Sequence, residues 1–122
     1  MNALLWILQA ALAAVFAASG LAKISQPKDR LIASGQTGVA PFPVPVIRLT
    51  ALCELLGAVG IVLPRLVGVA PYLTPLAAVG FAIVMVGAIA SHAYLREPRN
   101  VALTTLIFIA AVTVAVGRAH GL

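Results

Sequence analysis

The sequence predicts an all-α, polytopic membrane protein, a four-helix transmembrane bundle, from three observations. Of its 122 residues, 62% are hydrophobic and only 9% are charged, whereas a soluble domain is usually about 45–50% apolar and about 25% charged. The mean hydropathy is +1.11. The apolar residues fall in four runs of about 17–22 residues, close to the length that crosses a hydrocarbon core. An ordinary soluble globule and a disordered chain are both excluded by this composition.

The four spans are expected at about residues 3–22, 46–63, 71–92 and 101–117, in a single transmembrane domain covering 1–122. Helices are expected because an open sheet would leave backbone groups without hydrogen bonds in lipid. The runs also lack the alternation of barrel strands.

The first run carries no charge and contains the small segment Ala17-Ala18-Ser19, which would suit cleavage of a signal peptide. However, no positive charge precedes the run, and the run is longer than the apolar core of a typical signal peptide. An uncleaved helix is therefore favoured over a cleaved signal.

Prolines indicate the limits of the next two spans. Pro64-Arg65 is expected to end the second span. Pro71 and Pro75 are expected in the first turns of the third span, where proline is tolerated. The short link 93–100 then leads to the fourth.

A long proline-rich loop, residues 24–45, joins the first two spans. Asp29 to Gln36 is expected to form a short helix. The segment 41–45 cannot be helical throughout, because each proline lacks a donor and restricts the residue before it. This apolar segment is expected either at the membrane interface or folded back over the bundle, where it would cover a pocket.

Eight basic residues outnumber three acidic ones, and most of the basic residues flank the apolar runs. One side of the membrane receives Lys23, Lys28, Arg30, Arg48, Arg96 and Arg99, and the other receives Arg65 and Arg118. The positive-inside rule predicts a multi-pass cell-membrane protein with loops 23–45 and 93–100 cytoplasmic and both termini outside. Because aromatic residues are few, these charges indicate anionic lipid head groups as partners, and no nucleic acid.

Cys53 is the only cysteine in the sequence. It excludes a disulfide within the chain and a CxxC redox pair. It is expected to be a small packing residue. The two histidines lack the spacing of a metal site, so no metal is predicted.

Glu54 is the most informative residue, because it lies near the middle of the second span. A charge there costs roughly 2.5–3.5 kcal/mol on insertion scales, so such a residue normally faces the bundle interior and has a partner. Protonation is the other solution. Ala51, Gly57 and Ala58 share its helix face, and small residues permit close helix contact. A functional or obligatory paired role is therefore favoured for Glu54.

The remaining polar residues gather at the span ends on the side of the two loops. Glu54 lies six residues beyond Arg48, roughly 9 Å deeper, and is turned away from it. Lys23 or His92 from a neighbouring helix is therefore the expected partner of Glu54. We predict a polar pocket with Glu54 at its floor. Its predicted ligand-binding residues are Ser19, Lys23, Arg48, Glu54, His92 and Asn100.

Simpler roles stay open for several of these residues. Lys23 and Arg48 can snorkel to head groups. His92 can be an interfacial residue. Ser91 and Asn100 can cap helices.

Several pieces of the sequence together resemble the DoxX-like family of small four-helix membrane proteins, over nearly the whole chain. They are SGLAK at 19–23, RLTALCELLGAVG at 48–60, LTPLAAVGFAIVMVGAIASH at 73–92, Asn100, and Gly117-Arg118. The family's characteristic polar positions match Lys23, Arg48, Glu54, His92 and Asn100. The resemblance implies association with redox metabolism, since some relatives are subunits of thiosulfate–quinone oxidoreductase; a distant branch assists assembly of membrane receptors. Without an intrinsic cofactor motif, a redox role would need a bound quinone or an oxidoreductase partner.

Three functions follow from these residues. The first is a binding or accessory subunit that holds a small amphipathic ligand, a quinone or lipid, or a partner helix. The second is a small membrane enzyme with Glu54 or His92 as catalytic acid–base, although no serine-triad motif accompanies them. A proton-coupled transporter is least favoured, because four helices offer little gating machinery; a homo-oligomer would weaken that objection.

Overall fold

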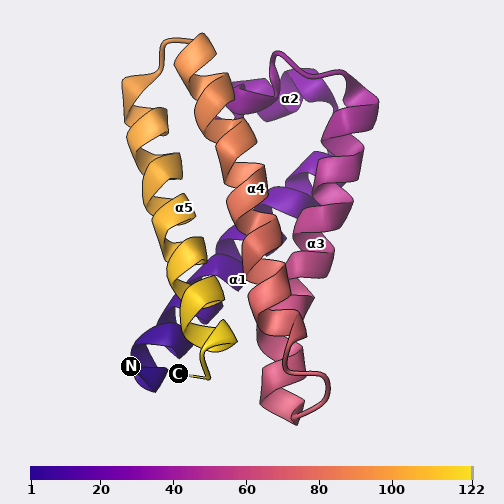
Figure 1. Ribbon diagram of the computed structural model, residues 1–122. Helices are drawn as coiled ribbons and strands as arrows, with labels where there is room; N and C mark the ends of the chain where they lie inside the picture. Colours follow the sequence, from indigo (N-terminus) through magenta and orange to yellow (C-terminus); the bar gives the residue numbers. More distant parts are fainter. Residues whose placement is uncertain (122) are drawn as a thin grey trace.

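The computed structural model describes residues 1–121, and within them the chain forms helices and no strand. The elements are α1 (Asn2–Ser25), α2 (Lys28–Ala33), the 3-10 turn η1 (Thr37–Val39), α3 (Val44–Val67), α4 (Leu73–Tyr94) and α5 (Pro98–Ala119) (Figure 1). Helices α1, α3, α4 and α5 each have 22 or 24 residues and are apolar enough to cross a membrane. A 22-residue helix is roughly 33 Å long, which matches the hydrocarbon core. The predicted four-helix membrane fold is confirmed.

The bundle is built from two helix pairs. Helix α1 packs along α3, and α4 packs along α5; α3 also contacts α4, and α5 contacts α1, which closes the ring. The start of α1 and the end of α5 lie at one end of the bundle, and α2 lies at the other (Figure 1). The two pairs therefore meet around one interior.

In the half of the bundle nearer the chain ends, apolar side chains form the main core. The rings of Phe16 on α1 and Phe81 on α4 stack with centroids 3.9 Å apart. Gly57 of α3 makes room for them, since a Cβ there would lie 2.5 Å from Phe81 Cε1. Exposed leucine and isoleucine side chains, such as Leu56 and Leu106, cover the outside, as lipid contact requires.

Pro64 does not end the second span; α3 continues to Val67 and ends at Gly68, whose φ is +74°. Proline at 64 has no N–H for the Gly60 carbonyl. The hydroxyl of Thr74 on α4 donates to that oxygen at 3.4 Å. A neighbouring helix thus supplies the missing donor, which is how membrane helices tolerate proline.

Three other expectations need correction. The short helix in the first loop covers Lys28–Ala33, not residues 29–36, and Pro71 precedes α4 instead of lying within it. Cys53 is exposed and not a packing residue. The inner face of α3 is formed by Ile47, Ala51, Glu54 and Ile61, which turns Cys53 outward.

Candidate functional site

A cavity of about 750 Å³ separates the two helix pairs near α2. It lies beyond Phe16 and receives side chains from all four long helices and from the first loop. Five of the six predicted site residues line it: Ser19, Lys23, Glu54, His92 and Asn100. The sixth, Arg48, does not.

Lys23 and Glu54 form the charged floor of the cavity. Lys23 Nζ lies 3.0 Å from Glu54 Oε1, and the exposed fractions of the two side chains are 12% and 1%. The Ser19 hydroxyl is 3.4 Å and 3.2 Å from the two carboxylate oxygens. Gly20 allows this approach of α1 to α3, because a Cβ there would lie 3.0 Å from the Ala51 carbonyl oxygen. The expected partner of Glu54 is therefore Lys23, which pairs with it and does not snorkel.

Arg48 connects α3 to the end of α1 instead of entering the cavity. Its Nη1 donates to the backbone carbonyl of Lys23 and, at 2.7 Å, to that of Gln26. The last carbonyls of a helix lack partners within that helix, and a cation is favourable at this negative end of the helix dipole. Arg48 is therefore a positioning residue that fixes the backbone carrying Lys23.

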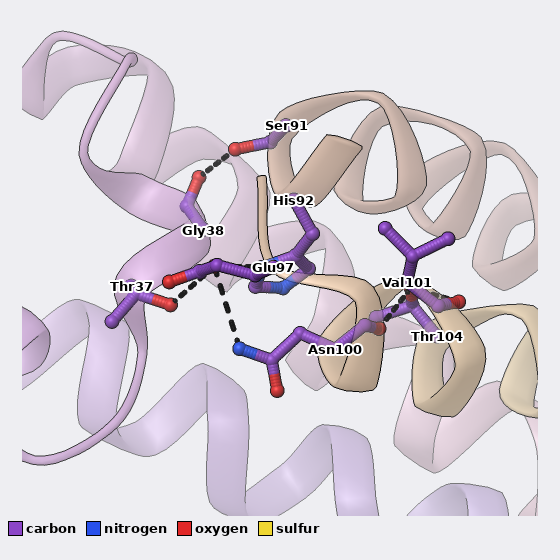
Figure 2. A network of polar contacts seen from close by, with 8 residues as sticks. All are labelled: Thr37, Gly38, Ser91, His92, Glu97, Asn100, Val101 and Thr104. Carbon is purple, nitrogen blue, oxygen red and sulfur yellow. Dashed lines mark hydrogen bonds and ion pairs between the residues drawn. The ribbon is translucent and has the colours of Figure 1, made fainter. Parts of the chain in front are cut away.

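His92 pairs with Glu97 and not with Glu54. The carboxylate oxygen Oε1 of Glu97 lies 2.7 Å from His92 Nδ1, 2.9 Å from Thr37 Oγ1 and 3.4 Å from Asn100 Nδ2 (Figure 2). These hydrogen bonds lower the pKa of Glu97 below its usual value, and the bond from His92 has the largest effect. Asn100 bonds to the N-cap residue of α5 and is not itself the cap.

The first loop covers the cavity with residues 34–42, whereas of the proline-rich segment 41–45, expected at the interface or folded over the bundle, only Phe42 lines it. Ser91 Oγ donates to the Gly38 carbonyl at 2.6 Å (Figure 2). Glycine favours this close contact, since a Cβ at Gly38 would lie 3.0 Å from the His92 ring. We call residues 34–42 the lid. Its lining residues are Ser34, Gly35, Gln36, Gly38, Val39 and Phe42.

A second polar cluster, at the other end of the bundle, was not predicted from the sequence. Gln9 Nε2 donates to the Ile61 carbonyl at 2.7 Å, and Arg118 Nε donates to Gln9 Oε1 at 2.7 Å. Arg118 Nη1 also donates to Asn2 Oδ1 at 2.8 Å, and its guanidinium lies 5.4 Å from the centroid of Trp6. The seven-residue spacing of Asn2 and Gln9, two turns of one helix face, was the available signal.

Chemically, the site offers a buried ion pair, an imidazole and an amide around an apolar chamber. His92 Nε2 makes no hydrogen bond within residues 1–121. Over the same residues, no group of three His, Cys, Asp or Glu side chains is placed to hold a metal ion.

Comparison with known proteins gives one match. No curated protein and no solved structure matches the sequence. The model of the DoxX-like family matches residues 7–116, which include most of the first and last spans, all of the second and third, and every residue lining the cavity. The chain belongs to the DoxX-like family of membrane proteins.

Proposed function

We propose that this protein holds a small amphipathic ligand, a quinone or a membrane lipid, in the cavity and acts as a binding or accessory subunit associated with redox metabolism. The observation that carries the proposal is the cavity itself, with polar groups at one end and apolar side chains elsewhere. Its volume of about 750 Å³ falls within the range of about 300–1,000 Å³ that is usual for small-molecule sites.

The cavity wall has a polar part and an apolar part, and this arrangement supports an amphipathic ligand. Lys23 and Glu54 offer charge and hydrogen bonds, whereas Phe16, Met85 and Ile107 line the chamber with apolar surface. A fully polar ligand would leave its own groups unpaired against that surface, which is unfavourable. A head group near the ion pair and a chain against the apolar wall would satisfy both regions.

The test is mass spectrometry of the gently purified protein and of the lipids extracted from it. Ala18 and Ala14 are both exposed on α1, but only Ala18 lines the cavity. We expect wild type and Ala14→Trp to retain a quinone or lipid reproducibly, and Ala18→Trp to lose it. Equal retention by both variants, or no retained ligand in wild type, would refute the proposal. A co-purifying oxidoreductase would support the accessory role.

A second candidate, a small membrane enzyme, is favoured by the pair of His92 and Glu97. A carboxylate that fixes one ring nitrogen leaves the other available for proton transfer, the arrangement expected of a general base. For this function, His92 is therefore a better candidate than Glu54 for the catalytic acid–base. Incubation with a membrane lipid extract, followed by mass spectrometry, tests it: product formation should disappear in His92→Ala. Product formation unchanged in both His92→Ala and Glu54→Gln would exclude this function.

A further inference from the structure

We infer that the cavity selects an amphiphile whose head group is uncharged and carries a hydroxyl, in preference to one with a phosphate. The inference rests on the proposed function, because it concerns the occupant of the same cavity. The charges and hydrogen-bonding groups on the cavity wall indicate which kind of head group the cavity can bind.

The charges that reach the cavity are already paired. Its titratable lining residues are Lys23, Glu54 and His92. Lys23 and Glu54 neutralise each other at 3.0 Å, and His92 faces the carboxylate of Glu97 at 2.7 Å. Arg48 is bound to backbone carbonyls and does not line the cavity. A phosphate would therefore meet no cation without an existing partner among the described lining residues.

An anionic head group could gain a cation only by drawing Lys23 away from Glu54. The Glu54 carboxylate, 1% exposed, would then keep only the Ser19 hydroxyl as a partner. Removing one partner from a buried ion pair is strongly unfavourable, because the other charge stays in a medium of low dielectric constant. This penalty falls on phosphates and not on neutral head groups.

A hydroxyl finds complementary groups beside this pair. Gln26 lines the cavity, and its side-chain oxygen Oε1 is buried and accepts no hydrogen bond in the described structure. An ammonium group has three N–H donors, and Lys23 uses one of them on Glu54. A hydroxyl can accept from Lys23 without displacing Glu54, and it can donate to Gln26 once the amide of that side chain turns toward the cavity. Both residues then gain a partner, and the ion pair stays in place.

The apolar part of the ligand has a path to the bilayer. Among the lining residues are Val15 of α1 and Leu103 of α5, with exposed fractions of 45% and 54%. Both side chains belong to spans and to the cavity wall, so the cavity opens sideways to the lipid-facing surface. An acyl or prenyl chain can leave through this opening while the head group stays at the floor.

The test compares two lipids that differ only in the phosphate. The full chain in detergent receives equal amounts of a diacylglycerol and the phosphatidic acid with the same acyl chains, and native mass spectrometry measures the bound fractions. We expect a preference of about tenfold or more for diacylglycerol, equivalent to about 1.4 kcal/mol. Equal binding, or a preference for phosphatidic acid, overturns the inference but leaves the proposed function standing. Binding of neither lipid, with no ligand retained from the membrane, refutes both.

Variants that change the charge of Glu54 or Lys23 test whether the ion pair causes the preference for diacylglycerol. Glu54→Gln removes the partner of Lys23, so the preference should move toward phosphatidic acid. Asp29→Asn is the matched control, because Asp29 is an exposed acidic residue that does not line the cavity, and it should leave the preference unchanged. If Glu54→Gln does not fold, Lys23→Gln gives the opposite change and should lower phosphatidic acid binding further. An increase of that binding in Lys23→Gln would contradict the inference.

Discussion

Lys23 on α1 and Glu54 on α3 form an ion pair of 3.0 Å at the floor of the cavity, 31 positions apart in the chain. The pair joins the two helices that pack most closely on one side of the bundle. It also cancels the charges that face the cavity. The same two side chains therefore affect both the stability of the bundle and the choice of ligand.

We expect Lys23→Ala and Glu54→Ala each to lower the free energy of unfolding by about 3 kcal/mol or more, since either leaves a buried charge unpaired. The double variant should lose less than the sum of the two, by about 0.5–3 kcal/mol. Denaturant unfolding in detergent, followed by circular dichroism, measures this. Lys28→Ala is the control, because Lys28 bonds to the Phe42 carbonyl and should combine additively with Glu54→Ala. Additive losses for the Lys23 cycle would show that the pair is not coupled.

Gln9→Leu should destabilise the bundle, because it removes two buried hydrogen bonds. One joins the Gln9 side chain to the Ile61 carbonyl, and the other joins it to Arg118. A buried polar group that loses its partner typically costs about 1–3 kcal/mol. Gln36→Leu is the matched control, since no hydrogen bond of the Gln36 side chain is present in residues 1–121. The same unfolding measurement should show a much smaller change for it. A loss as large in Gln36→Leu would contradict this account.

Gly57→Ala should disturb the stacked rings of Phe16 and Phe81. Its Cβ would lie 2.5 Å from the ring of Phe81, and overpacking a core typically costs about 1–3 kcal/mol. Gly80→Ala is the control on α4, where the Cβ meets nothing within 4 Å. It should be neutral or stabilising by up to about 1 kcal/mol, the usual gain of alanine over glycine in a helix. Equal melting temperatures for the two variants would rule out the close contact.

The lid should loosen in acid. The folded-state pKa of Glu97 lies below the usual 4.5, so ionised Glu97 stabilises the closed lid above that pH. This contribution is lost as the pH falls below 4.5 through the lowered pKa. A spin label at Ser34→Cys, with Cys53→Ala, should therefore gain mobility in that range.

Two controls accompany the pH measurement. A label at Val69→Cys, in the turn at the other end of the bundle, should show no change. Glu97→Gln should abolish the pH dependence of the Ser34 label and leave the lid mobile throughout. If the transition persists in Glu97→Gln, another group, such as Asp29 on α2, controls the lid.

The orientation in the membrane can be decided by thiol labelling of intact cells. In a Cys53→Ala background, Lys28→Cys should be protected from an impermeant reagent and Val69→Cys should react, because the positive-inside rule places the first loop in the cytoplasm. The reverse pattern of labelling would show that both termini are cytoplasmic.

The sequence predicts how deep a residue lies in the membrane better than it predicts which neighbouring residue that side chain contacts. Hydropathy locates the four spans within a few residues, and the insertion cost of Glu54 correctly indicates a buried partner. Pro64 is misjudged because its missing donor is replaced by Thr74, a residue of another helix. Such compensation is a property of the packed bundle and is not visible in a single span.

The sequence also does not predict which side chains meet when the chain turns between two helices. Glu97 looks like an ordinary charge of a short link, yet the chain bends so that it meets His92, five positions earlier, and Thr37 of the lid. Arg118 likewise looks like a topology residue at a span end, but it is buried against Gln9. The spacing along the chain does not specify how far a helix is rotated about its axis, and that rotation determines both contacts.

The contact of Gln9 with Arg118 has a consequence for synthesis of the chain. Helices α1 and α3 can pair as soon as both are inserted, through the Ile61 carbonyl and the ion pair at the cavity floor. The donor to Gln9 Oε1 is Arg118, which lies 109 positions later in the chain. This hydrogen bond can form only when the last turn of α5 has been made. A chain that ends before that turn therefore lacks this hydrogen bond, and the Gln9 side-chain oxygen in its first span has no Arg118 to accept from.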